Sequence, residues 1–342
     1  MPPAKSNRPA GAKDAPARAA SAPPASAAAP SGAHTHYHRL IAHAAGGVPL
    51  RMAVVHPCDA ASIAGALQAA RLGLIDPVLV GPRLRIAAAA ANAGEDLARH
   101  PIVDVPHSHA AAARAVALVR EGAVAALMKG SLHTDELMAE VVAAETGLRT
   151  ARRVSHCFVL DVPGHPEALI VSDAAVNIAP TLGEKADIVR NAIDVARALA
   201  FDGPRVAILS ATESVTARVP STVDAAALCK MAERGQIVGG DVDGPLALDN
   251  AIDPAAAAAK GIVSRVAGRA NVLIVPDLEA GNMLAKSLTF LAHADAAGIV
   301  VGARVPIALT SRADSVMARL ASCAVAVLVA RARALDAAKA LV

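Results

Sequence analysis

Four short segments of the sequence combine hydroxyl, amide and charged side chains in the way that anion sites do. In the first, residues 128–135 (MKGSLHTD), the side chains of Lys129, Ser131 and Thr134 supply hydrogen-bond donors. Gly130 between them lets backbone N–H groups approach an anion. The pattern suits a phosphate group, and a helix cap beside a solvated lysine would give the same residues.

The second segment places Asp173 and Asn177 directly after an apolar run. Thr181 and Glu184 follow at capping-box spacing, so starting a helix explains both of them. Capping does not explain Asp173 and Asn177, which remain candidates for ligand binding.

The third segment begins with Asp277, which suits either a ligand contact or a helix N-cap. Gly281 and Asn282 follow in the first turns of the expected helix, where both lower helix propensity. That cost indicates close approach of a ligand or of another backbone segment.

The fourth segment holds Thr310, Ser311 and Arg312 between an apolar run and a helical pattern. A guanidinium beside free backbone N–H groups makes a strong site for an oxyanion or a phosphate. Ser311 and Asp314 also have N-cap and N3 spacing, so both suit a structural role equally well.

Apolar runs alternate with amphipathic segments from residue 51 onward, which predicts parallel sheets covered by helices on both faces. Strands are predicted over residues 51–56, 77–80, 102–105, 124–128, 154–160, 168–171, 205–209, 272–275, 298–301 and 307–309. Helices are predicted over residues 59–72, 107–120, 184–199, 222–234 and 279–293, from 134, and from about 312. The turn-rich stretch 161–165 predicts a hairpin. Ligands of such sheets bind beyond the carboxyl ends of strands, where the four segments lie.

Composition narrows the function classes. The chain has 342 residues, which suggests two domains, and 54% hydrophobic residues, enough for large cores. Aromatic residues are only 1%, against single-strand nucleic-acid stacking, and the net charge of +3 gives no strong field for duplex DNA. No apolar run reaches the roughly 18 residues of a membrane span, and the N-terminus has no secretory apolar region. We expect neither nucleic acid nor membrane as partner.

Residues 1–35 are rich in Ala, Pro and Ser, which predicts a disordered tail. Four histidines at its end suit a metal, but no Cys or carboxylate completes a site, which favours a polar lead-in to the first helix. They are His34, His36, His38 and His43. Four cysteines lack CxxC spacing and predict reduced thiols, hence a cytoplasmic protein. They are Cys58, Cys157, Cys229 and Cys323.

Several familiar motifs are missing from the sequence. It contains no G-x-G-x-x-G after a strand, no Walker A run, no H-E-x-x-H and no G-x-S-x-G. P-loop hydrolysis, zinc proteolysis and α/β-hydrolase chemistry therefore lose support. The residues alone indicate a two-domain α/β protein with several anion sites.

Taken together and in order, the segments resemble the phosphate acetyl/butyryltransferase family from about residue 50 onward. The resemblance rests on five stretches, 128–138 (MKGSLHTDELM), 152–164 (RRVSHCFVLDVPG), 171–181 (VSDAAVNIAPT), 276–288 (PDLEAGNMLAKSL) and 306–315 (PIALTSRADS). It implies two α/β/α domains of isocitrate/isopropylmalate dehydrogenase-like architecture with the active site in the interdomain cleft. Residues 36–155 with 305–342 would form domain I, and 156–304 an inserted domain II. Family members are commonly homodimers.

The implied reaction is reversible acyl transfer, in which acyl-CoA and phosphate give acyl phosphate (such as acetyl phosphate) and CoA. It needs no metal, no cofactor and no covalent enzyme intermediate, because the CoA thiolate attacks the acyl phosphate directly. A related branch carries a hydratase-like domain in front. Only the tail precedes the matching region here, so we predict no hydratase activity.

The resemblance also implies roles for single residues. Ser311 would stabilise the oxyanion, Arg312 would bind phosphate, and Arg153 would contact phosphate or CoA. The family's catalytic aspartate lies seven residues after the serine, where this chain has Ala318. Asp314 is the nearest carboxylate, and we predict it as the proton acceptor.

The remaining predicted substrate-binding residues come from all four segments. They are Lys129, Ser131, Thr134, Asp173, Asn177, Asp277, Asn282 and Thr310. A further family arginine has no clean match, with Arg114 and Arg120 as candidates.

Two other functions stay open from the sequence. A decarboxylating NAD(P)-dependent dehydrogenase would need a metal-binding carboxylate cluster. Asp241, Asp243 and Asp249 come close, but their Gly-rich surroundings favour turn residues. A non-catalytic CoA- or phosphate-sensing paralogue is motivated by Ala318. Acetyl and butyryl substrates are not distinguished, since one methylene is worth only about 1–3 kcal/mol.

Overall fold

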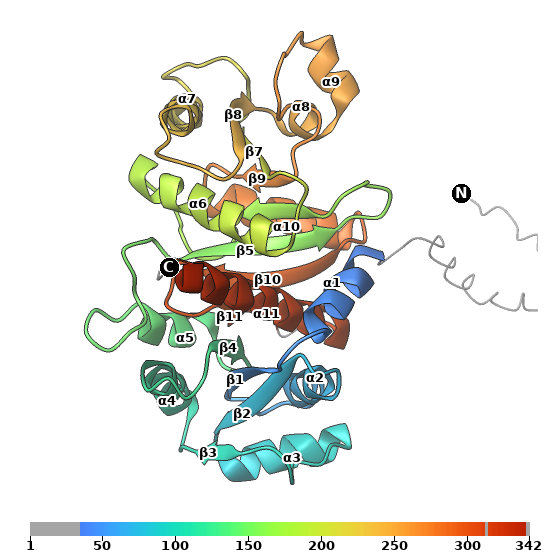
Figure 1. Cartoon of the computed structure of the whole chain (residues 1–342), viewed down its shortest axis with the longest axis vertical. Helices are drawn as coiled ribbons and strands as arrows, with labels where there is room; N and C mark the ends of the chain where they lie inside the picture. Colours follow the sequence, from blue (N-terminus) through green and yellow to red (C-terminus); the bar gives the residue numbers. More distant parts are fainter. Residues whose placement is uncertain (1–34, 312–313, 340–342) are drawn as a thin grey trace, which may run out of the picture. The chain divides into compact units, whose positions relative to one another are not determined.

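A computed structural model describes residues 35–311 and 314–339, whose strands form a single mixed sheet of eleven (Figure 1). The strands are β1 Leu50–Val55, β2 Ile75–Gly81, β3 Ile102–Asp104, β4 Ala126–Lys129, β5 Ser155–Asp161, β6 Leu169–Ser172, β7 Arg205–Leu209, β8 Asp241–Leu246, β9 Val272–Ile274, β10 Asp295–Val301 and β11 Ile307–Ala308. The helices are α1 Thr35–Ala45, α2 Ala60–Arg71, α3 Arg83–Ala93, α4 Ser108–Arg120, α5 Thr134–Val141, α6 Leu182–Ala198, α7 Pro220–Glu233, α8 Leu248–Ile252, α9 Pro254–Ala259, α10 Leu278–Phe290 and α11 Val316–Lys339.

The strand order is β3-β2-β1-β4-β11-β10-β5-β6-β9-β7-β8. The first five strands are parallel to one another, and so are the last four. Between these two blocks, β10 is antiparallel to β11 and β5, and β5 is antiparallel to β6. The predicted hairpin over residues 154–171 is therefore confirmed. The predicted α/β structure rich in parallel strands is present, and the antiparallel strands β10 and β5 join both parallel blocks into one sheet.

The two faces of the sheet are packed differently. On one face a single core runs through both blocks, from Val54 of β1 through Ile299 of β10 to Ile208 of β7. On the other face there are two cores, one around β1, β4 and β11 and one around β6, β7 and β9. The alternation of side chains along β10 assigns these two cores to the same face, since Val300 belongs to one and Ala296 packs against the other.

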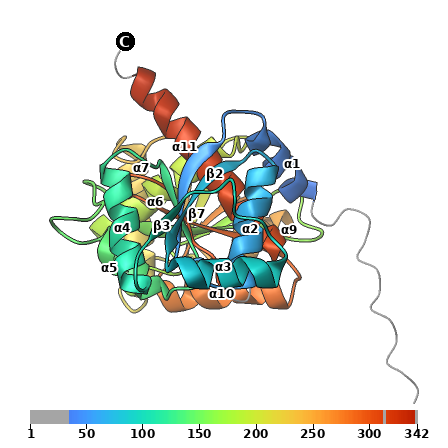
Figure 2. The same ribbon diagram turned by 90° about the horizontal axis from the view of Figure 1, so that it is seen from below.

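The helices follow this division. Residues of α6 and α11 belong to the continuous core, and Figure 1 shows α6 lying beside β5 and α11 lying over β10 and β11. Viewed from below in Figure 2, α4 and α5 lie on one side of the first block and α2 on the other. The face with two cores, called the split face below, therefore carries α4 and α5 at one end and α10 at the other. Leu284 of α10 packs against the core around β6, β7 and β9.

Most predicted elements are present with ends shifted by a few residues. The final helix begins at Val316 rather than at about 312. His36, His38 and His43 lie inside α1 rather than before it, while residues 1–34 are outside the described part of the chain. Within the described residues, none of the helices has the length and apolar character to span a membrane.

Candidate active site

The ends of β4 and β11 lie side by side, because the two strands pair in parallel. Lys129, the last residue of β4, is buried, and its Nζ donates hydrogen bonds to the carbonyl oxygens of Thr310 and Gly130, each at 3.3 Å. The Thr310 hydroxyl donates in return to the Lys129 carbonyl at 3.4 Å. These contacts bring together two residues that the sequence places in separate segments.

Arg319 holds the same loop from the other side. Its side chain is among the largest fully buried ones, and Nη1 donates to Thr310 Oγ1 at 2.8 Å while Nη2 donates to the Ser311 carbonyl at 3.0 Å. Helix α2 fits over it at Gly65, where a Cβ would lie 2.9 Å from Arg319 Cδ. Sequence reasoning missed this residue. The available signal was a single charged residue in the apolar first half of this helix, over residues 316–330.

Ser311 and Asp314 form a reciprocal turn. The Ser311 N–H donates to Asp314 Oδ2 at 2.7 Å, and the Asp314 N–H donates to the Ser311 carbonyl at 3.2 Å. The N-cap interpretation of Ser311 is wrong, because Ser315 Oγ accepts from the N–H of Ala318 and caps α11 instead. Arg312 lies outside the described residues.

Asp314 lies in an environment that suits a proton acceptor. Burial raises the pKa of its carboxyl group, and the hydrogen bond from the Ser311 N–H and the charges of Arg319 and Lys129 act against this rise. The carboxylate is thus partly withdrawn from water while two cations remain nearby.

Donors of the loop after β4 form hydrogen bonds with carbonyl groups at the end of β1. The amides of Gly130 and Ser131 donate to the carbonyls of Val55 and His56, both at 2.9 Å, and Ser131 Oγ donates to the His56 carbonyl at 2.8 Å. These two amides are therefore engaged within the fold rather than turned to an anion. Thr134 is the first residue of α5.

A second group of predicted residues surrounds Arg153, just before β5. Its Nε donates to Asn177 Oδ1 at 2.7 Å, and its Nη1 pairs with Glu184 at 3.1 Å. Asn177 Nδ2 donates to the Val154 carbonyl at 2.9 Å and to Asp173. Asn177 therefore orients Arg153.

Asp173 is buried and shapes the loop that follows β6. Its Oδ1 accepts from the N–H groups of Ala175 and Val176 at 2.9 and 3.0 Å, and its Oδ2 accepts from the N–H of Asn177 at 3.2 Å. Burial raises the pKa of the Asp173 carboxyl group, and these hydrogen bonds oppose the rise. The side chain that capping left unexplained is accounted for by its own loop.

The start of α10 packs directly on this loop. Asp277 is the N-cap of the helix and accepts from the N–H of Ala280 at 2.8 Å. Asn282 Nδ2 donates to the Ala174 carbonyl at 3.2 Å. A Cβ on Gly281 would lie 2.6 Å from the Asp173 carbonyl oxygen. The expectation of close backbone approach at Gly281 is confirmed.

The two groups lie beyond opposite ends of the central strands. Lys129 and Thr310 follow the carboxyl ends of β4 and β11, whereas Arg153 precedes β5, which runs in the same direction as β11. The chain after β11 turns onto the split face, since the Leu309 carbonyl oxygen lies 2.2 Å from where a Cβ on Gly298 would be.

His156 of β5 lies on this same face and was not among the predicted residues. It is buried edge-on against Phe158, with ring centroids 4.4 Å apart, and its Nδ1 has no hydrogen-bond partner within the described residues. Burial lowers its pKa to about 3, so the ring is neutral. The signal available in the sequence was a histidine in an apolar strand pattern.

Other candidates are placed away from these groups. Arg114 is paired with Glu121 on the outside of α4. Asp241 and Asp243 lie in strand β8, so their interpretation as turn residues is wrong. The described residues hold no group of three or more His, Cys, Asp or Glu side chains that could bind a metal ion.

The geometry defines an α/β protein with cationic, hydroxyl and carboxylate groups gathered at strand ends. A model of the phosphate acetyl/butaryl transferase family matches residues 107–327. The chain belongs to this family, and it is a phosphate acyltransferase.

Similar proteins include a phosphate acetyltransferase of Rhizobium meliloti, 66% identical over 297 residues that cover 87% of this chain and 94% of the relative. A phosphate butyryltransferase of Clostridium acetobutylicum is 40% identical over 280 residues, covering 82% and 93%. The crystal structure of a branched-chain phosphotransacylase from Enterococcus faecalis matches with a TM-score of 0.71 and 29% identity, covering 82% of this chain and 99% of that one.

Proposed function

We propose that this acyltransferase moves an acyl group between CoA and inorganic phosphate at the loop that holds Ser311 and Asp314. In the direction of acyl-CoA formation, the CoA sulfur attacks the carbonyl carbon of an acyl phosphate. An S–C bond forms, the C–O bond to phosphate breaks, and phosphate leaves. The thiol proton passes to Asp314, since a thiol with a pKa of about 8.5 needs a base to react at neutral pH.

The observation that carries this proposal is the fixed position of the loop. Lys129 and Arg319, both buried, grip Thr310 and the Ser311 carbonyl, so the Ser311 hydroxyl is held on a rigid frame. A rigid donor stabilises a developing oxyanion without reorganising during the reaction. Arg312 follows Ser311 directly in the chain, and we assign it the phosphate.

The substrates would meet in a cleft on the split face of the sheet. Support comes from the two separate cores on that face and from Arg153 and Asn177, whose chain neighbours Val154 and Val176 belong to or pack against the core around β1, β4 and β11. Residues 36–155 with 305–342 would form one wall and residues 156–304 the other. Lys129, Ser131, Thr134, Asp173, Asp277 and Asn282 would then shape or line this cleft.

The wider setting follows from the family. We propose acyl-CoA, CoA, phosphate and acyl phosphate as the ligands, a homodimer as the assembly and the cytoplasm as the location. The free state of the four cysteines in the described chain agrees with a reducing compartment. The acyl group is acetyl or butyryl, as named for the relatives.

A direct assay tests this function. Purified protein is mixed with phosphate and with acetyl-, propionyl- or butyryl-CoA in a chelator, and thiol release is followed. We expect turnover without added metal and a fall in kcat of about 10²–10³-fold in Ser311→Ala, the usual effect of removing one oxyanion donor. Turnover only with NAD(P) and a metal would make it a dehydrogenase instead. CoA binding without turnover would make it a sensing paralogue, the possibility that Ala318 raises.

A further inference from the structure

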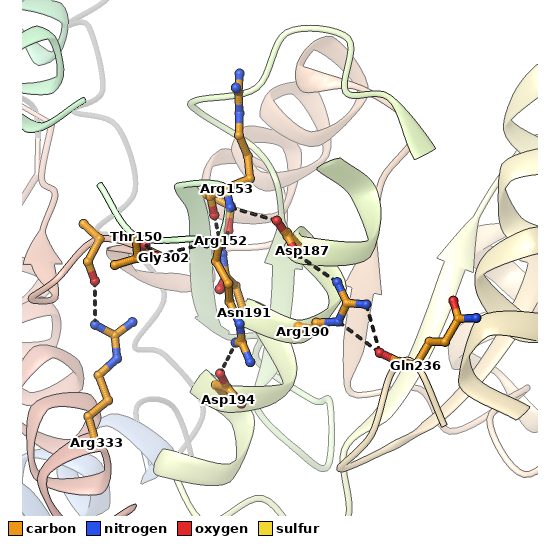
Figure 3. Close-up of polar contacts among 12 residues, drawn as sticks. Thr150, Arg152, Arg153, Asp187, Arg190, Asn191, Asp194, Gln236, Gly302 and Arg333 are labelled. Atoms are coloured by element: carbon orange, nitrogen blue, oxygen red, sulfur yellow. Dashed lines mark hydrogen bonds and ion pairs between the residues drawn. The ribbon is translucent and has the colours of Figure 1, made fainter. Parts of the chain in front are cut away.

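A pocket that the proposed reaction does not use lies beside the start of β5. Its volume is about 420 Å³, and it is lined by the segments 150–152 and 302–304, by α6 and by α11. Its charged lining residues are Arg152, Arg304, Arg333 and Asp194. None of the predicted acyl-transfer residues lines it. Arg153 is next in the chain, but Figure 3 shows its side chain extending away from Arg152 and Asp194.

The positive charges in this pocket are not balanced by the described residues. Asp194 is the one carboxylate of the lining, and it is already paired with Arg152. The Arg333 side chain makes a single hydrogen bond to the described chain, from Nη1 to the Ala303 carbonyl at 3.0 Å. The Arg304 guanidinium makes no hydrogen bond or ion pair to any described residue. Two guanidinium groups therefore face the pocket with unused donors.

Arg333 is held in this position against its own preference for water. It is half-buried near the end of the buried part of α11, and burial together with the charge of Arg152 lowers its pKa, while Asp194 opposes the change. Like charges gathered in a partly buried pocket destabilise one another unless an anion joins them.

The backbone around the pocket is fixed. Gly302 has a φ of +86°, and a Cβ there would lie 2.3 Å from the Arg153 carbonyl oxygen. Thr150 Oγ1 donates to the Gly302 carbonyl at 2.6 Å, and Asn191 Nδ2 donates to the Arg153 carbonyl at 2.8 Å. The arginines therefore project from a wall that does not need to reorganise when a ligand arrives.

We propose that this pocket is a second anion site, which binds a compact, multiply charged oxyanion separately from the acyl-transfer substrates. Guanidinium forks match the oxygens of phosphate and carboxylate groups. The lining contains no aromatic side chain for a base to stack on, and its apolar part is only Ala151, Gly302 and Ala303. This favours a small organic phosphate or a polycarboxylate over a nucleotide.

Isothermal titration of the full-length protein with pyrophosphate and, separately, with citrate tests the proposal at constant ionic strength. The double variant Arg304→Gln/Arg333→Gln should bind the better of the two anions about 10- to 100-fold more weakly than the parent, as expected for losing hydrogen bonds to charged groups. Arg304→Gln alone should weaken binding in the same direction, and because this exposed side chain has no partner in the described chain, its loss does not threaten folding.

The matched control is Arg234→Gln, which removes an exposed charge at the end of α7, and it should bind like the parent. The KM for phosphate in the acyl-transfer assay should stay unchanged in every variant. The anion that binds more tightly tells whether the ligand is a phosphate or a carboxylate. Equal binding by the parent and both pocket variants, or no binding of either anion, would overturn the proposal. A parallel rise in the KM for phosphate would do the same, since the pocket would then belong to the substrate site.

Discussion

Arg319 is the residue on which the proposed active site depends most, although it touches the loop rather than the substrate. From the protein interior, its Nη1 donates a hydrogen bond to Thr310 Oγ1 and its Nη2 donates one to the Ser311 carbonyl. Both Nη groups of this buried guanidinium have acceptors in the reactive loop, while its Nε has no hydrogen-bond partner within the described residues. The residue therefore acts as a positioning group for Ser311.

Replacing Arg319 with lysine should keep the charge but lose the two-armed contact. We expect kcat to fall about 10²-fold, the effect of a misplacement of about 1 Å, while the KM for CoA changes little. Steady-state kinetics measure the split between kcat and KM. The exposed Arg99→Lys is the control and should behave like the parent. A kcat within twofold of the parent would remove Arg319 from this role.

Asp314 makes a prediction about pH. An ordinary aspartate has a pKa of about 3.9. Burial raises the pKa of Asp314, so on acidification Asp314 is protonated at a higher pH than an ordinary aspartate. The rate of acyl-CoA formation should fall as the pH is lowered through the raised pKa of Asp314. In Asp314→Asn the rate should be about 10²–10⁴-fold lower and the acid limb should disappear.

The same raised pKa fixes the sign of the effect on stability. The folded state binds this proton more tightly than the unfolded state does, so the group's contribution to stability falls as pH rises from the ordinary to the raised pKa.

A retained acid limb in the pH–rate profile of Asp314→Asn would show that another carboxylate accepts the proton. In that case a carboxylate other than Asp314 would replace the family's catalytic aspartate, whose position is taken by Ala318 in this chain.

Residue types in the sequence located the ends of strands but not the partners of each side chain. Asp173 was a ligand candidate because its local pattern gave it no other task, and its partners turned out to be the next amides in its own loop. His156 and Arg319 were overlooked because a single polar residue in an apolar run gives no sign of what it faces. Both depend on contacts between distant segments, which spacing along the chain does not encode.

At the level of helices and strands, segments with a clear apolar pattern were predictable, including the short strands β3, β9 and β11, and segments without one were not. Strand β8 (DVDGPL) contains Asp, Gly and Pro, which are depleted in strands, and it pairs only with β7 at the edge of the sheet. Helices α8 and α9 have five and six residues. Helix α3 is mostly alanine and shows little amphipathic contrast. In these elements tertiary contacts decide the conformation.

The contact between α10 and the loop after β6 gives a prediction at this level. Gly281→Ala would place a methyl group 2.6 Å from the Asp173 carbonyl oxygen and 2.7 Å from Val275 Cγ2. We expect a loss of about 1–3 kcal/mol in the free energy of unfolding from overpacking, despite the better helix propensity of alanine.

Urea denaturation measures that loss. Gly183→Ala in α6 is the control, because a Cβ there meets nothing within 4 Å. It should stabilise the protein by about 0.4–1 kcal/mol. If both variants had the same stability, α10 would not be packed on the loop as described.

For the molecule as a whole, the sequence indicated two α/β units but not the continuity between them. The alternation of strands and helices is the same whether two sheets lie apart or share strands. The antiparallel pairing of β10 with β5 and β11 joins them, and one core then runs behind both blocks. Pairing between strands so distant in the chain is not written in local periodicity.

This shared core predicts how the protein unfolds. Because Ile299, Val54 and Ile208 belong to the same core, we expect residues 35–339 to melt in one cooperative transition. Differential scanning calorimetry should give equal calorimetric and van't Hoff enthalpies. Two resolved transitions would show that the halves are thermodynamically separate despite the common sheet.

The position of β11 also has a consequence for biosynthesis. This two-residue strand follows ten others in the chain, yet it inserts between β4 and β10 in the middle of the sheet. A nascent polypeptide on the ribosome must therefore wait for residues 307–308 before the flanking strands are bridged, and until then both expose unpaired backbone edges. The hydrogen bond from Lys129 to the Thr310 carbonyl likewise forms only after this late segment has been made, so the proposed active site is assembled after most of the strands.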